Sequence, residues 1–295
     1  MPLEAKDLRG TFSAIVTPFS ADGLALDLKS LEKLLEFQLE AGVDGIVACG
    51  STGEAATLSD VEYEQVLKHT AKIVAKRAPV IAGVNSSSTA RACEIARAAA
   101  AAGMDAVLLV APPYNKPPQS GIYEHFVRVR EACGVPIVAY NIPGRCAVNI
   151  TPQTIAKLGR DGIVIGVKES AGSMDQILEL LLETNGKISI LSGEDTLVNA
   201  LIASGGHGVI SAVANIIPQS FKQITRAALA GDFAAAGRTQ LEILPIIKCM
   251  FSETNPIPVK TALAFRGIIA HSAVRLPLVP AQVETVEKIK KILEL

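Results

Sequence analysis

A single lysine ends a buried-looking apolar run in the segment "GIVIGVKES" (162–170). The β-branched residues before Lys168 predict a strand that is covered on both faces. An ammonium group among such side chains loses solvation, which favours the neutral amine that attacks a carbonyl to form a Schiff base. Residues 168 and 169 point to opposite sides of a strand, so Glu169 is poorly placed to pair with Lys168. Taken alone, a lysine at a strand end more often reaches solvent. Within the barrel architecture derived below, we interpret Lys168 as a nucleophile.

A Schiff-base lysine needs a proton shuttle, because carbinolamine formation and dehydration both move protons. Tyr140 lies near the end of the apolar run "PIVAYNIPG" (136–144) and is the natural candidate. Its alternative is a core tyrosine whose hydroxyl is satisfied by the protein. Tyr114, in the Pro-rich stretch "PPYNKPP" (112–118), could instead be a surface or subunit-contact aromatic.

Two further segments could hold carboxylates. In "GSTGE" (50–54), the turn that starts at Gly50 can direct backbone N–H groups toward an anion, and Ser51 and Thr52 add hydroxyls. A carboxylate the size of that of pyruvate would fit such a turn. Arg145 offers a forked donor for a second carboxylate. Taken alone, these features also suit an ordinary glycine turn and a surface arginine.

The elements that must position these residues follow a regular pattern. Short runs rich in Val, Ile or Leu alternate with longer amphipathic segments, and the runs lie at 11–19, 44–50, 79–85, 105–112, 136–144, 163–170, 188–193 and 207–213. Eight strand–helix units in about 230 residues predict an α/β protein with a (β/α)8 TIM barrel. A doubly wound open sheet would usually carry a Gly-rich phosphate turn after its first strand, whereas "TPFSADG" follows here.

We predict a catalytic barrel over residues 1–231 and a C-terminal helical appendage over 232–295, which contains helical patterns but no strand pattern. The appendage would pack on the barrel or on another subunit. In a barrel of this type, chemistry gathers at the C-terminal ends of the strands. The candidate lysine, tyrosines, hydroxyls and arginine all fall at those ends, and this shared position favours the functional interpretation.

Composition excludes several classes of function. A formal net charge of -1 gives no electrostatic basis for a nucleic-acid partner. No stretch reaches the ~18 uninterrupted apolar residues of a membrane span. Five widely spaced cysteines without a CxxC pair, and four histidines without metal-ligand spacing, predict neither a disulfide framework nor a metal site. The N-terminus has no signal pattern, so we expect a cytoplasmic protein.

The chain resembles the dihydrodipicolinate synthase/N-acetylneuraminate lyase superfamily of Schiff-base aldolases. The similarity runs from "GTFSAIVTPF" to "NPIPVKTAL", and the motifs that carry it are "PPYNKP", "YNIPGR", "GVKES", "SGED", "GGHGVISAVAN" and "NPIPVK". Within the superfamily the synthase branch is the most similar. This implies condensation of pyruvate with L-aspartate 4-semialdehyde to 4-hydroxy-tetrahydrodipicolinate, in lysine and diaminopimelate biosynthesis.

The resemblance also implies roles for individual residues. Lys168 matches the lysine that forms the imine with pyruvate, and Tyr140 matches the proton donor and acceptor. Ser51 and Tyr114 match the hydroxyl pair of the proton relay, with Tyr114 supplied by the neighbouring subunit.

Substrate binding is implied for three further positions. Thr52 and the backbone at Ile210 match positions that bind pyruvate, and Arg145 matches the arginine that receives the carboxylate of the aldehyde. The family implies a homotetramer built as a dimer of dimers, with a covalent imine and no metal or organic cofactor.

The sequence departs from the usual synthase pattern at several positions. Most synthases carry two threonines where this chain has Ser51 and Thr52, and "GSTGE" also occurs in neuraminate lyases. Pro113 stands where a second tyrosine is common. Lysine-inhibited members carry an asparagine and a glutamate at the positions of Ser87 and Arg91. An arginine would repel the ammonium of lysine, so we expect weak or absent feedback inhibition.

Two alternatives remain at this point. The first is an aldolase of the same superfamily that acts on a sugar acid, such as N-acetylneuraminate or 2-keto-3-deoxygluconate. It would keep the Schiff base but need polyol contacts in place of Arg145. The second is a non-catalytic small-molecule sensor, of which loss of Lys168 or Tyr140 would be the expected mark. Both residues are present.

Overall fold

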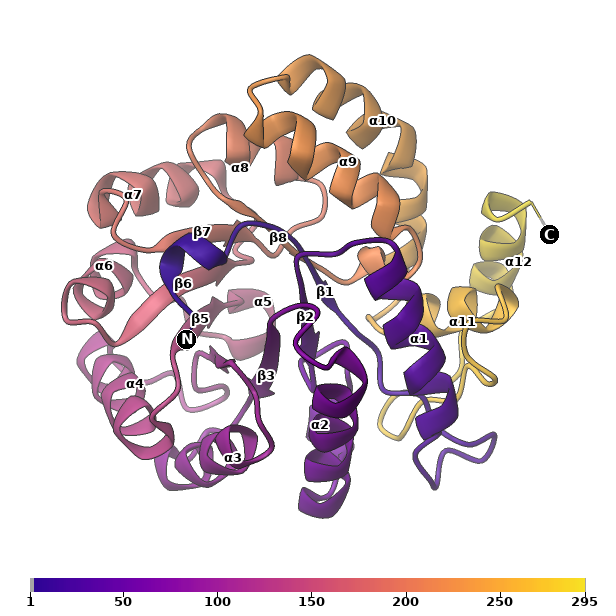
Figure 1. Ribbon diagram of the computed structural model, residues 1–295, viewed down its shortest axis with the longest axis horizontal. Helices are drawn as coiled ribbons and strands as arrows, with labels where there is room; N and C mark the ends of the chain where they lie inside the picture. The colour runs from indigo at the N-terminus through magenta and orange to yellow at the C-terminus, as the bar shows by residue number, and fades with distance from the viewer. Residues whose placement is uncertain (1–2, 295) are drawn as a thin grey trace.

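Eight parallel strands close into a barrel in the computed structural model, which describes residues 3–294. Each strand pairs with the next along the chain, and β8 returns to β1 (Figure 1). All eight predicted strands are present, as β1 Gly10–Ala14, β2 Gly45–Ala48, β3 Val80–Val84, β4 Ala106–Val110, β5 Ile137–Asn141, β6 Val164–Glu169, β7 Ser189–Ser192 and β8 Gly208–Ser211. The predicted TIM barrel is confirmed.

The first predicted strand extended too far. β1 ends at Ala14, whereas the apolar run continues to Phe19. Pro18 has no N–H to donate to a sheet ladder. Beyond the strand the backbone N–H of Val16 instead donates to Oδ1 of Asn215, at 3.1 Å.

A ring of helices surrounds the strands, as the alternation of apolar runs with amphipathic segments predicted. The ring comprises α1 Leu28–Glu40, α2 Asp60–Val74, α3 Thr89–Ala101, α4 Gln119–Cys133, α6 Pro152–Arg160, α7 Met174–Thr184, α8 Val198–Ala203 and α9 Pro218–Leu229. Shorter helices that the patterns did not predict are α5 Pro143–Cys146 and the 3-10 turns η1 Ala5–Asp7, η2 Ala55–Thr57 and η3 Val213–Asn215.

The N-terminal end of the barrel is closed by the chain's own N-terminal segment. Leu8 is fully buried, and its Cδ1 lies so near Gly166 that a Cβ on that glycine would approach it to 2.8 Å. The hydroxyl of Ser189 donates to the carbonyl of Ala5 at 2.6 Å. The opposite, C-terminal end of the strands is thereby left as the functional face.

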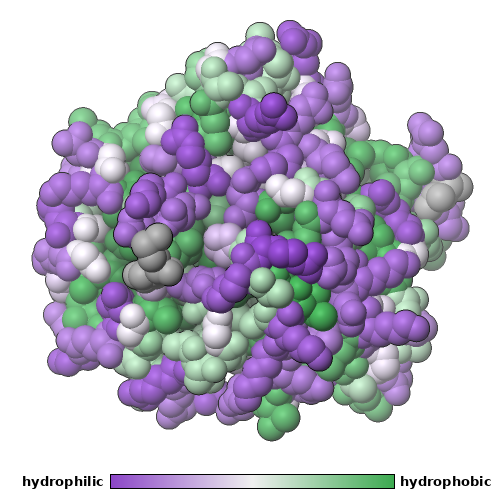
Figure 2. All heavy atoms as spheres, in the orientation of Figure 1, coloured by the Kyte–Doolittle hydropathy of each residue, from purple (hydrophilic) through white to green (hydrophobic). Residues whose placement is uncertain are grey.

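Three C-terminal helices lie outside the ring: α10 Phe233–Met250, α11 Ile257–Phe265 and α12 Val283–Ile292 (Figure 1). Helix α10 packs against α9, and α12 packs against both α10 and α11. The boundary at 231/232 stays a prediction. On the face shown in Figure 2, hydrophilic residues predominate, with hydrophobic residues in smaller areas between them. Within residues 3–294, no helix combines the length and the apolar character that a membrane span requires.

Candidate active site

Lys168 and Tyr140 face one another on adjacent strands. They are register partners on β6 and β5, and Nζ of Lys168 lies 4.5 Å from the centroid of the Tyr140 ring. Both side chains are buried, at 7% and 6% exposure. The structure therefore brings the predicted amine and the predicted proton shuttle into contact.

Glu169 points away from this pair, as the alternation along a strand predicted. Its carboxylate accepts hydrogen bonds from Nδ2 of Asn141, from Nε2 of Gln176 on α7 and from the backbone N–H of Ala171. Burial raises the pKa of Glu169 above its ordinary value, and these hydrogen bonds oppose the shift. All of these partners are amide groups, so the carboxylate of Glu169 is directed to them and not to the amine of Lys168.

Two other carboxyl groups, those of Glu194 and Asp195, interact electrostatically with the Lys168 amine. Burial raises the pKa of Glu194 and raises that of Asp195 to about 6, whereas the charge of Lys168 lowers both. Between β7 and these residues, Gly193 leaves room for the lysine stem. A Cβ on Gly193 would lie 1.7 Å from Oγ of Ser170 and 2.9 Å from Cε of Lys168.

The "GSTGE" segment forms a tight turn after β2. The backbone N–H of Gly53 donates to the carbonyl of Gly50 at 3.1 Å, and that of Glu54 to the carbonyl of Ser51 at 3.2 Å. Within residues 3–294, no protein acceptor takes the N–H groups of Ser51 and Thr52. Adjacent N–H groups left available in a turn form an anion-binding nest. The turn can therefore hold a small carboxylate.

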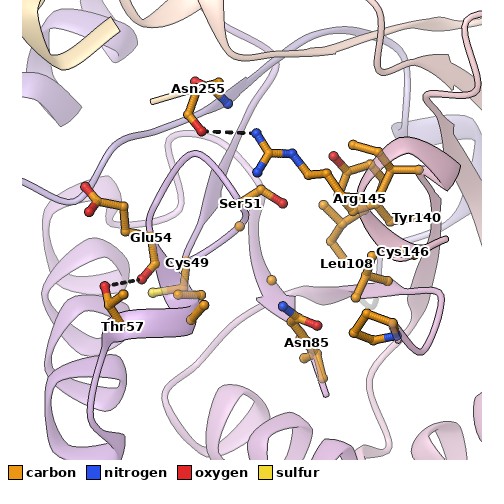
Figure 3. Close-up of a pocket in the computed structure, with 18 of the residues that line it drawn as sticks. Cys49, Ser51, Glu54, Thr57, Asn85, Leu108, Tyr140, Arg145, Cys146 and Asn255 are labelled. Atoms are coloured by element: carbon orange, nitrogen blue, oxygen red, sulfur yellow. Dashed lines mark hydrogen bonds between the residues drawn. The ribbon is translucent and has the colours of Figure 1, made fainter. Parts of the chain in front are cut away.

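A cavity of about 260 Å³ opens above these elements. The residues that line it include Gly50, Ser51, Tyr140, Arg145, Asn255 and Leu278. In Figure 3, Arg145 and Asn255 lie on one side of the cavity and Ser51 near its centre. A space of this size, with a basic side chain and a turn rich in donors, suits a small organic acid.

Arg145 is tied to the nest through Asn255. Nη2 of Arg145 donates to the backbone carbonyl of Asn255 at 3.0 Å (Figure 3). Nδ2 of Asn255 in turn donates to Oγ1 of Thr52 at 2.9 Å. The two proposed carboxylate sites are thus held at a fixed separation.

Four of the eight predicted site residues line the cavity: Gly50, Ser51, Tyr140 and Arg145. Thr52 and Ile210 are buried but outside the lining, and Lys168 lies against the Tyr140 ring. Tyr114 is 87% exposed and is not among the residues that line the cavity. The roles of all eight residues stay predictions.

Sequence reasoning gave no role to three residues that the structure places at or beside the cavity. Asn255 and Glu54 line it directly, and Lys260 donates to Oε1 of Glu54. Asn255 and Lys260 belong to "NPIPVK", which lies far from the barrel strands in sequence. The Asn and Lys on either side of its two prolines were the available signal. The described residues contain no group of three or more His, Cys, Asp or Glu side chains that could hold a metal ion.

Comparison with known proteins identifies the family of the chain. A sequence model of the Dihydrodipicolinate synthetase family matches residues 7–295. The chain is 45% identical, over 97% of both chains, to a 4-hydroxy-tetrahydrodipicolinate synthase of Thermodesulfovibrio yellowstonii.

Solved structures of dihydrodipicolinate synthases are also similar to this chain. The chain superposes with a TM-score of 0.94 on dihydrodipicolinate synthase from Thermotoga maritima, at 39% identity and 97% coverage of each chain. It also superposes with a TM-score of 0.94 on a chloride-inhibited dihydrodipicolinate synthase from Acinetobacter baumannii in complex with pyruvate. That protein is 40% identical, and the match covers 97% of this chain and 98% of the other. The chain belongs to the dihydrodipicolinate synthetase family.

Proposed function

We propose that this protein condenses pyruvate with L-aspartate 4-semialdehyde to give 4-hydroxy-tetrahydrodipicolinate, a step of lysine and diaminopimelate biosynthesis. The observation that carries the proposal is the buried contact between Lys168 and Tyr140 beside a cavity with a carboxylate nest. The relatives at 45% identity that are named for this activity support it over a sugar-acid aldolase.

The first half of the reaction builds an enamine on Lys168. The N–H groups of Ser51 and Thr52 hold the carboxylate of pyruvate while the neutral amine attacks the ketone carbon. Tyr140 delivers a proton to the departing oxygen, so that water leaves and a protonated imine forms. Loss of a methyl proton to the tyrosine relay then gives the enamine. No bound metal or organic cofactor takes part in these steps.

The second half joins the aldehyde. The enamine carbon attacks the aldehyde carbon of the second substrate, and Arg145 receives that substrate's carboxylate in bidentate geometry. The link from Arg145 through Asn255 to Thr52 fixes the distance between the two substrates. The substrate's amine then displaces Lys168 by transimination, which closes the ring and frees the lysine.

Tyr114 completes the relay from a second subunit in this proposal. Its ring is 87% exposed in the single chain, which is the position expected of a residue that serves a neighbour's site. We accordingly propose a homotetramer built as a dimer of dimers, located in the cytoplasm.

A parallel assay separates this function from the sugar-acid alternative. Pyruvate with aspartate semialdehyde is assayed in a coupled reaction beside retro-aldol assays on N-acetylneuraminate and 2-keto-3-deoxygluconate. We expect turnover only in the first assay, because Arg145 supplies a carboxylate contact where the sugar acids need polyol contacts. Turnover of a sugar acid without condensation of the semialdehyde would overturn the proposal.

A further inference from the structure

A fully buried ion pair lies at the end of the 50–54 turn. Nζ of Lys260, on α11, donates to Oε1 of Glu54 at 2.6 Å, and the two side chains are 0% and 1% exposed. The barrel's other described ion pairs are at least partly exposed. A buried pair of this kind often contributes less to stability than apolar residues of similar volume would. Its presence here therefore calls for a role besides stability.

The surroundings of the pair hold both charges in place. The centroid of the Phe19 ring lies 4.1 Å from Nζ of Lys260 and 4.2 Å from Cζ of Arg275. The backbone N–H of Arg275 donates to Oε2 of Glu54 at 3.0 Å, so both oxygens of Glu54 have partners. Burial lowers the pKa of Lys260 to about 8, and the attraction of Glu54 opposes that shift.

Glu54 occupies a strained backbone position at the end of the nest. Its φ is +53°, and Cys49, on the other side of the turn, has the same φ. Left-handed conformations of residues other than glycine persist only where the surroundings hold them. At Cys49 the neighbouring β3 provides the support, because Gly83 packs against its carbonyl so closely that a Cβ would lie 2.2 Å away. At Glu54 the side chain is held at both oxygens, by Lys260 and by the N–H of Arg275.

We infer that Lys260 is a positioning residue for pyruvate, acting through Glu54 to hold the 50–54 turn in the shape that leaves the N–H groups of Ser51 and Thr52 available to a carboxylate. The inference rests on the proposed function. Two residues of the same C-terminal segment reach the turn, since Asn255 donates to Thr52 and Lys260 to Glu54. The carboxylate nest is therefore built jointly by the β2 loop and the segment around α11.

The test uses Lys260→Met, which keeps the length of the side chain and removes its charge. The readout is the pyruvate concentration that gives half-maximal borohydride trapping, beside the extent of trapping at saturation. We expect the half-maximal concentration to rise about tenfold while the saturated extent stays near wild type, because the amine is untouched and the nest is displaced. An unchanged half-maximal concentration in the folded variant would overturn the inference.

The matched control is Lys222→Met. Lys222 donates to both oxygens of Asp44 at 2.7 Å, and Asp44 immediately precedes β2, at the end of the strand opposite the nest. This variant breaks a lysine–carboxylate pair at the start of β2 and leaves the turn after β2 unchanged. We expect its pyruvate dependence to match wild type, and a rise equal to that of Lys260→Met would overturn the inference.

A double variant keeps the test decisive if Lys260→Met alone does not fold. Glu54→Gln with Lys260→Met leaves no unpaired buried charge and retains an acceptor for Arg275. We expect a folded protein with the same tenfold rise, and a wild-type pyruvate dependence would contradict the inference. A wild-type protein that forms no pyruvate adduct would instead contradict the proposed function, so the two failures are distinct.

Discussion

At the scale of single residues, the site depends on how closely side chains can approach Lys168. Tyr140 covers the amine on one side, and Gly193 borders its stem where any side chain would collide with Ser170. Gly193 does not have a positive φ, so the absence of a Cβ, rather than backbone freedom, is what the position requires. The position of Lys168 therefore depends on the absence of a side chain at residue 193 as well as on the contact with Tyr140.

Gly193→Ala should therefore impair catalysis. The new methyl group would overlap Oγ of Ser170 and press on Cε of Lys168, which shifts the amine from its place beside Tyr140. We expect kcat to fall by about 100-fold, since a displacement near 1 Å has effects of that size. Steady-state kinetics with pyruvate and aspartate semialdehyde measure the change.

Gly121→Ala is the control. Gly121 lies within α4, and a Cβ there would meet only ordinary contacts at 3.6 Å or more. We expect unchanged kcat and a free energy of unfolding about 0.4–1 kcal/mol higher. If both variants kept wild-type activity, Gly193 would have no part in placing the lysine.

The residues at strand ends could be predicted for two reasons. Side chains alternate between the two faces of a strand, and the chemistry of a TIM barrel gathers at the C-terminal ends of its strands. Lys168 and Glu169 diverge as a two-residue period requires, and Tyr140 meets Lys168 in register. Asn255 and Lys260 could not be predicted in the same way. They reach the nest from α11 and the residues before it, and no local pattern reports a contact across some 200 residues of chain.

At the scale of elements, the loop after β2 is braced at several points. A capping box formed by Ser59 and Glu62 begins α2, and both of its hydrogen bonds are present. Glu62 also accepts from the Arg275 guanidinium, at 2.6 and 2.9 Å. One carboxylate thus joins the start of α2 to the C-terminal segment.

This carboxylate should make stability depend on acid pH. Hydrogen bonds from Arg275 lower the pKa of Glu62 to about 2, below the ordinary 4.5. Between these values the unfolded chain binds more protons, so the contribution is fully present above pH 4.5 and is lost as pH falls toward 2. We expect Glu62→Gln to cost on the order of 1 kcal/mol at neutral pH, and less as pH falls through that window.

Denaturant unfolding at several pH values measures this difference, with Glu64→Gln as control. Glu64 lies on the same helix in an exposed pair with Lys68. Its removal should change stability by less than about 0.5 kcal/mol at every pH. A Glu62→Gln deficit that did not shrink in acid would show that the carboxylate is not held by Arg275 in solution.

Feedback inhibition by lysine belongs to the same scale. Arg91, near the start of α3, forms ion pairs with Asp60 on α2 and with Glu94. A guanidinium stands here where lysine-inhibited members carry a glutamate, and it cannot pair with an ammonium group as that glutamate would. We expect steady-state activity to be insensitive to L-lysine, and a normal micromolar-to-millimolar inhibition curve would contradict this expectation.

At the scale of the whole molecule, the barrel itself was the most predictable feature. Eight apolar runs separated by amphipathic segments leave little choice of architecture, and the structure confirms each run as a strand. The lengths were less predictable, because apolar residues such as Val16 and Phe19 are buried outside the ladder as well as within it. The way α11 supports the active-site loop required the three-dimensional arrangement.

Assembly can be tested by mixing two defective variants. If Tyr114 serves a neighbour, a Tyr114→Phe subunit keeps Lys168 and can receive a tyrosine from a Lys168→Ala subunit. Random pairing then makes half of the dimers mixed, each with one intact site of two, so activity should recover to about a quarter of wild type. The measurement is the activity of co-refolded variants beside each variant refolded alone. No recovery in demonstrably mixed dimers would show that Tyr114 does not act across the interface.

The most direct test of the central claim is to identify the residue that bonds to pyruvate. The protein is incubated with pyruvate, reduced with borohydride, digested and mapped by mass spectrometry, beside a Lys168→Ala variant treated in the same way. We predict one reduced pyruvate adduct, on Lys168, and none in the variant. An adduct on another lysine, or an unmodified wild-type protein, would contradict the assignment of Lys168 as the nucleophile.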